Sequence, residues 1–371
     1  MADQIPGERP SGKRVTEGPW GKLEYYEVTL EPPTSHLWDA LYTERSFWNF
    51  GKIQREEAVA LFHAFRFSPS LVDLIEAEGR WTETKQGLEL DITDRIVETM
   101  TPENRAAIAR WFRKNSDDFF SRLLINLEAG DTTAMYDRLK PGTVDLVNSV
   151  SFRRGRVLSV MDRPYLLSKL GNDEDEKKAL IHSLFSTRAL VARLVVDDIS
   201  NIEALTDYWS AGGKNPGVRA ILGGVKAAPG VEHVDMVHLL PPVARKYLSG
   251  FISLQDVNPS NTPDCFWAAL QFFKSTPSPR VLDPLGLDHY LGHDFEEVPG
   301  ERTFGDVVCI FKKEDGDFLH SYVHVADDIV FTKNGASFAR PLILTLKSYM
   351  MSVYQDEDQY FERTFRRKVG T

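Results

Sequence analysis

The sequence is poor in cysteine. Only Cys265 and Cys309 occur in 371 residues, which excludes a disulfide-stapled scaffold of the kind that small secreted proteins use. Cysteine usage this sparse is typical of a reducing compartment.

A long apolar run is also missing. Residues 1–20, MADQIPGERPSGKRVTEGPW, lack the apolar centre of a secretion signal. No stretch approaches the ~18 consecutive apolar residues that a membrane-spanning helix needs. Together with the cysteine count, these absences predict a cytoplasmic protein with no membrane partner.

An excess of positive charge is absent as well. The chain has 44 basic and 54 acidic residues and a formal net charge of −10. Generic nucleic-acid binding needs a positive field, so we expect no nucleic-acid partner. No phosphate-binding loop of the GxxxxGK[ST] type occurs, and GGKNPG (212–217) is interpreted as an ordinary loop.

What the chain does contain is typical of globular domains. Its hydrophobic content is 42% and its charged content 26%, and its length favours two domains over one.

Helix signals dominate the N-terminal part. Ser68-Pro69 and Thr101-Pro102 each pair an N-cap residue with proline at the first helical position. Residues 79–93 are the stretch there that resembles a hairpin.

The C-terminal third has a different pattern. Three strand-like segments, Gly305–Lys313, Leu319–Asp328 and Asp328–Gly335, follow one another with turn residues between them. The sequence therefore predicts an α+β protein. We expect a disordered arm over residues 1–20, a mainly helical domain over 21–230, and an α+β domain over 231–371, with the Gly- and Pro-rich stretch 212–230 at the boundary.

The segment NTPDCFWAALQFF (261–273) places Cys265 at the start of an almost wholly apolar helix. Asp264 is a good N-cap residue, which puts Cys265 in the first turn. Unpaired amide groups at a helix N-terminus stabilise a thiolate and lower the thiol pKa. Cys265 is therefore a candidate nucleophile.

A nucleophilic cysteine needs a base, and His320 is the candidate. It opens the predicted strand Leu319–Asp328, where its imidazole could face the N-terminus of the cysteine helix. Cys309 lies within the apolar run VVCIF and is predicted to be inert core.

These residues in this order resemble the NlpC-like papain-fold cysteine hydrolases over about residues 245–360. The resemblance implies a papain-like domain whose nucleophile helix packs on an antiparallel sheet, with Cys265 as nucleophile and His320 as general base. Asn334 would orient the imidazole, with Lys333 and His324 as alternatives for that third role. The implied reaction is acyl transfer on a peptide-like amide or an ester, with no metal or organic cofactor.

Other interpretations stay open. Phe266-Trp267 stand where that family usually has Ser-Gly, which favours a catalytically inactive interaction or scaffold protein. The helical N-terminal region could bind a protein partner. His289 and His293 are spaced four residues apart, a third and weaker hypothesis of a metal pair.

Overall fold

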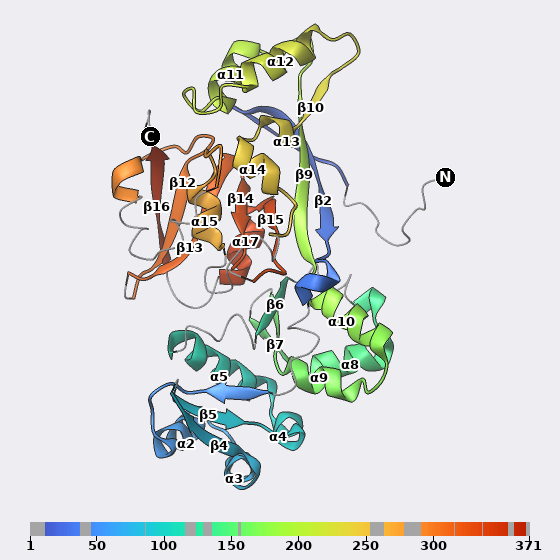
Figure 1. Ribbon diagram of the computed structural model, residues 1–371, viewed down its shortest axis with the longest axis vertical. Coiled ribbons are helices and arrows are strands. Elements are labelled where there is room, and N and C mark those ends of the chain that lie inside the picture. Colours follow the sequence, from blue (N-terminus) through green and yellow to red (C-terminus); the bar gives the residue numbers. More distant parts are fainter. Residues whose placement is uncertain are drawn as a thin grey trace. The chain divides into compact units, whose positions relative to one another are not determined.

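The chain folds into two compact units in the computed structural model (Figure 1). One, the inserted unit, is Glu31–Ser186; the other, the discontinuous unit, combines Met1–Leu30 with Thr187–Thr371. The structure describes residues 12–37, 46–85, 87–115, 124–128, 136–154, 157–252, 263–277, 291–314, 316–335, 337–354 and 360–368.

The inserted unit mixes short helices with two three-stranded antiparallel sheets, ordered β3-β5-β4 and β6-β8-β7. Its strands are β3 (Phe47–Asn49), β4 (Arg80–Thr84), β5 (Gly87–Asp91), β6 (Ile125–Glu128), β7 (Ser151–Arg154) and β8 (Val157–Val160). Its helices are η1 (Thr34–Leu37), α2 (Arg55–Ala64), α3 (Pro69–Glu78), α4 (Asp94–Thr99), α5 (Pro102–Asn115), α8 (Pro141–Ser149), α9 (Arg163–Lys169) and α10 (Glu174–Phe185).

Local signals account for several of these elements. Ser68 caps α3 by accepting from the Leu71 N–H at 3.2 Å, and Thr101 accepts from the Asn104 N–H at 3.2 Å at the start of α5. Both helices begin at the proline that the sequence placed first. The predicted hairpin over 79–93 is confirmed as β4 paired with β5.

The discontinuous unit contains two larger sheets. A four-stranded sheet has the order β1-β2-β9-β10, and a six-stranded sheet has the order β11-β16-β12-β13-β14-β15. The strands of the first are β1 (Arg14–Gly18), β2 (Gly21–Leu30), β9 (Thr187–Val195) and β10 (His233–Asp235). Those of the second are β11 (Phe295–Glu297), β12 (Val307–Lys312), β13 (Phe318–Ala326), β14 (Ile329–Lys333), β15 (Leu342–Leu346) and β16 (Tyr360–Arg367).

Helices accompany these sheets within the same unit (Figure 1). They are α11 (Ile202–Trp209), α12 (Val218–Ala227), α13 (Met236–Leu239), α14 (Pro242–Tyr247), α15 (Cys265–Leu270) and α17 (Lys347–Tyr354). One apolar core joins side chains from both sheets and from α11 to α15. A smaller core lies between the six-stranded sheet and α17.

The observed units differ from the expected domain limits. Residues Leu23–Leu30 of β2 pair with Thr187–Leu194 of β9, so the start of the chain belongs with its C-terminal half. Residues Arg14–Gly18, expected in a disordered arm, form a strand paired with β2; Met1–Ser11 lie outside the described residues. The mainly helical domain expected over 21–230 is instead divided between the two units and contains several strands.

The class that the structure supports is mixed α/β with antiparallel sheets. Within the described residues, every pair of named strands is antiparallel. Among those same residues, no helix combines the length and apolar character needed to cross a membrane.

The motif Gly305-Asp306 has a structural role in the six-stranded sheet. The Gly305 N–H donates to His324 O at 2.9 Å, and the His324 N–H donates to Asp306 O at 2.8 Å. These two hydrogen bonds align β12 with β13. The buried Asp306 carboxylate accepts from Arg366 Nε and Nη2 at 2.8 and 2.7 Å. This motif therefore sets strand register through backbone contacts and an ion pair.

Replacing Gly305 with alanine should destabilise the fold. Gly305 has φ +89°, and an added Cβ would lie 2.1 Å from the Phe273 ring, so backbone strain and a steric clash act together. We expect a loss of about 2–3 kcal/mol in the free energy of unfolding, measured by urea denaturation. Gly300 also has positive φ, but its Cβ would meet no atom within 4 Å; Gly300→Ala is the control and should cost less. Equal losses in the two variants would contradict the clash.

Candidate functional site

Cys265 is the first residue of α15, as the sequence predicted. Asp264 caps this helix, and its carboxylate accepts from the Trp267 N–H at 2.9 Å. The apolar residues that follow Cys265 pack into the main core. The helix lies against β13 and β14 of the six-stranded sheet (Figure 1).

The Cys265 thiol is buried, with 7% of the residue exposed. Burial and, after it, the neighbouring Asp264 carboxylate raise the pKa of this thiol to about 12. The Ser321 backbone and hydroxyl and the Lys333 ammonium act in the opposite direction but do not offset burial. The sulfur is therefore a neutral thiol near pH 7, contrary to the thiolate expected at a helix N-terminus.

The two faces of the six-stranded sheet carry different side chains. The α15 face, which carries Cys309 and Phe331, joins the main core. The α17 face, which carries Ile310 and Val330, packs against α17. Side chains alternate between the faces along each strand, so the parity of a residue decides which helix it meets.

Register places Cys265 and His320 on opposite faces. Ser321 pairs with Cys309 and so lies on the α15 face, beside the Cys265 sulfur. His320 pairs with Ile310 and lies on the α17 face. The nucleophile and base that the sequence predicted are therefore separated by the sheet, and the residue facing Cys265 is Ser321.

His320 is completely buried among its own partners. Its Nε2 lies 2.9 Å from Thr332 Oγ1, and its ring stacks on Tyr354 with centroids 4.3 Å apart. Nδ1 is buried and has no hydrogen-bond partner among the described residues. Burial lowers the pKa of this imidazole to about 3, so His320 is neutral at physiological pH.

The candidates for the third role divide between the faces. Asn334 directly follows β14, and its buried Oδ1 has no hydrogen-bond partner in the part of the chain that is described. His324 shares the α17 face with His320, as period-two alternation predicted. Burial, followed by the Arg302 cation, lowers the pKa of His324 to about 4. None of the described contacts joins Asn334 or His324 to the His320 ring.

Lys333 is the candidate that reaches the Cys265 side of the sheet. It is fully buried, and its Nζ donates to Gly335 O at 2.7 Å and Ser337 O at 2.9 Å. Burial lowers its pKa to about 7, and the Asp264 carboxylate acts in the opposite direction. The structure thus collects Asp264, Cys265, Ser321 and Lys333 on one face.

No motif in the sequence marks Ser321, although its strand pairing offers a signal. Once Cys309 is placed in the core beneath the cysteine helix, its antiparallel partner must share that face. Identifying that partner also requires the register between β12 and β13. A β-bulge between Ile310 and Phe311 makes this register hard to infer from sequence.

The described residues contain no group of three or more His, Cys, Asp or Glu arranged to hold a metal ion. Of the histidine pair considered for a metal, His289 lies outside the described residues. His293 Nδ1 lies 2.7 Å from Asp294 Oδ1 of the adjacent residue.

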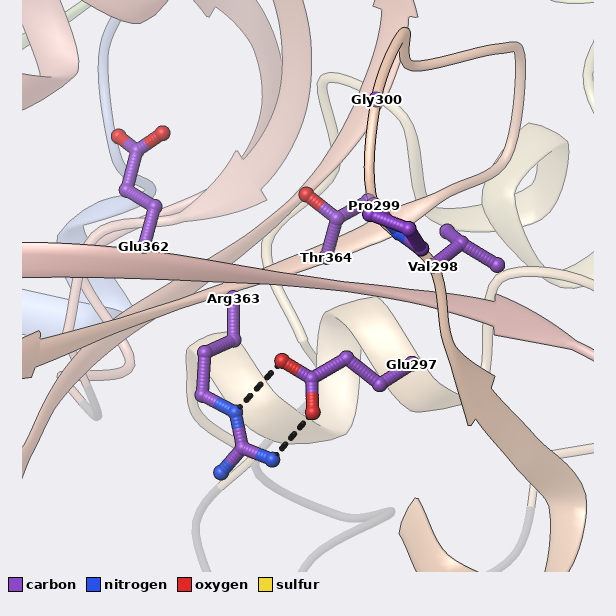
Figure 2. Close-up of a pocket in the computed structure, with 7 residues that line it drawn as sticks. All are labelled: Glu297, Val298, Pro299, Gly300, Glu362, Arg363 and Thr364. Atoms are coloured by element: carbon purple, nitrogen blue, oxygen red, sulfur yellow. Dashed lines mark hydrogen bonds and ion pairs between the residues drawn. The ribbon is translucent and has the colours of Figure 1, made fainter.

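A surface hollow of about 460 Å³ lies away from these residues, beside β11 and β16. Figure 2 shows the residues that line it, including Arg363 hydrogen-bonded to Glu297. Neither Cys265 nor His320 contributes to this hollow.

Comparison with known proteins adds no relative. No protein-family model, no curated protein and no solved structure matches the chain.

Proposed function

We propose that the discontinuous unit is a non-catalytic interaction module whose architecture resembles that of papain-like hydrolases. The observation that supports this most is the separation of Cys265 from His320 by the six-stranded sheet. A cysteine hydrolase needs its base within hydrogen-bond reach of the sulfur. The likeness to NlpC-like enzymes then concerns the order of elements rather than chemistry.

The protonation states point the same way. Cys265 has a pKa raised to about 12, so the attacking thiolate is scarce. His320 has a pKa lowered to about 3, so no imidazolium is available to stabilise a thiolate. Cysteine hydrolases rely on the opposite shifts, a thiolate paired with an imidazolium.

Alkylation of the native protein with iodoacetamide tests this proposal. The thiolate fraction of Cys265 at pH 7 should be about three thousandfold lower than that of an ordinary thiol of pKa about 8.5. We expect Cys265 and the buried Cys309 to stay unmodified from pH 6 to 8, as measured by mass spectrometry of proteolytic peptides.

The same reaction in 8 M urea is the control, because both thiols should then react. Selective modification of Cys265 in the folded protein below pH 8 would contradict a non-catalytic role. So would hydrolysis of chromogenic amide or ester substrates that Cys265→Ser abolishes.

One observation favours a second candidate, a cysteine hydrolase that uses Lys333 as its base. Lys333 lies on the Cys265 side of the sheet, and its pKa of about 7 suits proton transfer near neutral pH. In that case His320→Ala should retain hydrolysis of the chromogenic substrates, whereas Lys333→Met should abolish it. Loss of activity in His320→Ala alone would instead favour the Cys265–His320 pair.

A further inference from the structure

We infer that the outer edge of β16 is a docking site for an extended peptide of a partner protein, which adds to the six-stranded sheet as a further strand. This inference rests on the proposed interaction role and names the surface and partner class for it. Strand addition at an open sheet edge is a general mode of peptide recognition, in which backbone hydrogen bonds supply affinity.

One edge of β16 is only partly paired. On one side, β12 pairs with Tyr360–Phe365. On the other, β11 pairs only with Phe365–Arg367, and the Val298 N–H extends the ladder by one bond to Thr364 O at 2.9 Å. No strand among the described residues pairs with Tyr360–Arg363 on that side.

The chain after β11 explains why the pairing between β11 and β16 ends at Val298. Gly300, with φ +101°, turns the chain away. Because Thr364 O points to this edge, alternation predicts that the N–H and C=O of Glu362 point there too.

The open edge coincides with the surface hollow. The hollow of about 460 Å³ is lined by Glu297–Gly300 and Glu362–Thr364. Figure 2 shows Glu362 pointing to one face of β16 and Arg363 to the other. Arg363 is held by Glu297, which accepts from Nε at 2.9 Å and Nη2 at 2.5 Å. An added strand therefore meets a recess bounded on one face by the Arg363–Glu297 ion pair.

One face of this edge is aromatic. Phe361 is 38% exposed, and its ring stacks on Phe311 with centroids 5.2 Å apart. The aromatic row continues to Phe318, whose ring centroid lies 4.5 Å from that of Phe311. It ends at Phe266, whose ring centroid lies 4.3 Å from that of Phe318. A peptide side chain opposite Phe361 would lie on the same face, where a large apolar group would cover the exposed ring.

The other face carries a local excess of positive charge. The Glu362 carboxylate accepts from Arg302 Nη2 at 2.5 Å and Lys347 Nζ at 3.0 Å. Two cations around one anion leave a net charge of +1, and both cations are partly exposed. A peptide residue opposite Glu362 should therefore be acidic. The occupant that fits is an extended peptide with an apolar residue next to an acidic one.

Selection from a display library of random peptides of about seven residues, with the full chain as target, tests the inference. We expect enrichment of sequences in which an apolar residue adjoins an acidic one. Fluorescence anisotropy of the enriched peptides should show binding at least about tenfold weaker to Phe361→Ala than to wild type. Tyr26→Ala, which removes an exposed ring of similar exposure (42%) from β2, is the matched control and should bind within about twofold of wild type.

A second measurement needs only the wild-type protein. N-methylation of the alternate peptide amides that face β16 should abolish binding, whereas methylation of the other set should preserve it. Failure to enrich any peptide, or equal binding by Phe361→Ala and Tyr26→Ala, would overturn the inference. So would a wild-type dimer that Phe361→Ala converts to a monomer, because the occupant would then be a second copy.

These outcomes are separate from those of the alkylation experiment. A reactive Cys265 in a protein that still binds peptides at β16 would refute the non-catalytic role and leave the docking edge intact. An unreactive Cys265 in a protein that binds no peptide would leave the non-catalytic role intact and refute the docking edge.

Discussion

Asp162→Asn should lower the free energy of unfolding of the inserted unit by about 3–5 kcal/mol, the largest effect of a conservative substitution that we expect. Asp162 and Arg105 form a buried ion pair, and each residue is 1% exposed. Arg105 Nη2 also donates to Val97 O at 2.6 Å. Removing the carboxylate leaves a buried guanidinium without its counter-charge. An unpaired buried charge destabilises the folded state more than a buried ion pair does.

Asparagine is chosen because of the backbone at this position. Asp162 has φ +55°, in the left-handed region that asparagine tolerates better than other side chains. The substitution therefore isolates charge from backbone strain. Asp145→Asn on the exposed surface of α8 is the matched control and should change stability by less than about 0.5 kcal/mol.

Urea denaturation measures these differences. The double variant Arg105→Met/Asp162→Asn should be more stable than Asp162→Asn alone, because the stranded cation is also removed. A loss under about 1 kcal/mol in Asp162→Asn would mean that the pair contributes no more than an exposed one.

Lys333→Met should change how the stability of the discontinuous unit depends on pH. Burial lowers the pKa of Lys333 from 10.5 to about 7 in the folded protein. Between pH 7 and about 10, the unfolded chain therefore binds a proton that the folded chain does not. Wild-type stability should rise with pH there, with a contribution from Lys333 of up to about 1.4 kcal/mol per pH unit.

The sign follows from the two protonation states. Below pH 7 the ammonium is charged in both states, and burying it carries its full cost. As the pH rises above 7, the folded protein holds a neutral amine and the cost falls. In Lys333→Met this contribution disappears, so the slope from pH 7 to 8.5 should be smaller than in wild type.

Urea denaturation at a series of pH values tests this expectation. Lys22→Met, which removes an exposed lysine of β2, should leave the wild-type slope unchanged. The absolute stability of Lys333→Met also reflects the Gly335 and Ser337 carbonyls that lose their donor, so the slope is the decisive quantity. An identical slope in wild type and Lys333→Met would show that Lys333 keeps an ordinary pKa.

Local signals in the sequence predicted much of the secondary structure. Caps and prolines located the starts of α3, α5 and α15, because these signals act through hydrogen bonds within a few residues. Strand patterns located β12, β13 and β14, whose antiparallel pairing is confirmed. The expected domain limits differ from the units because β2 pairs with β9, more than 150 residues later, and that pairing leaves no local trace.

The candidate site was predicted in part for a similar reason. The position of Cys265 at a capped helix start depends on adjacent residues, and it was correct. Its partner depends on which face of β13 each residue occupies. A shift of one residue in register exchanges the two faces. The same sequence can therefore place either His320 or Ser321 opposite Cys265, depending on the register.

The amino-acid sequence by itself determined where α3, α5 and α15 begin, that the strands β12 to β14 pair antiparallel, and that Cys265 opens a buried helix. Only the tertiary structure decided that the chain's beginning joins its C-terminal half, that the sheet separates Cys265 from His320, and that burial holds the thiol protonated. The physical reason is range: caps and turns are hydrogen-bonded within a few residues, whereas strand register, side-chain parity and desolvation arise when distant segments pack together.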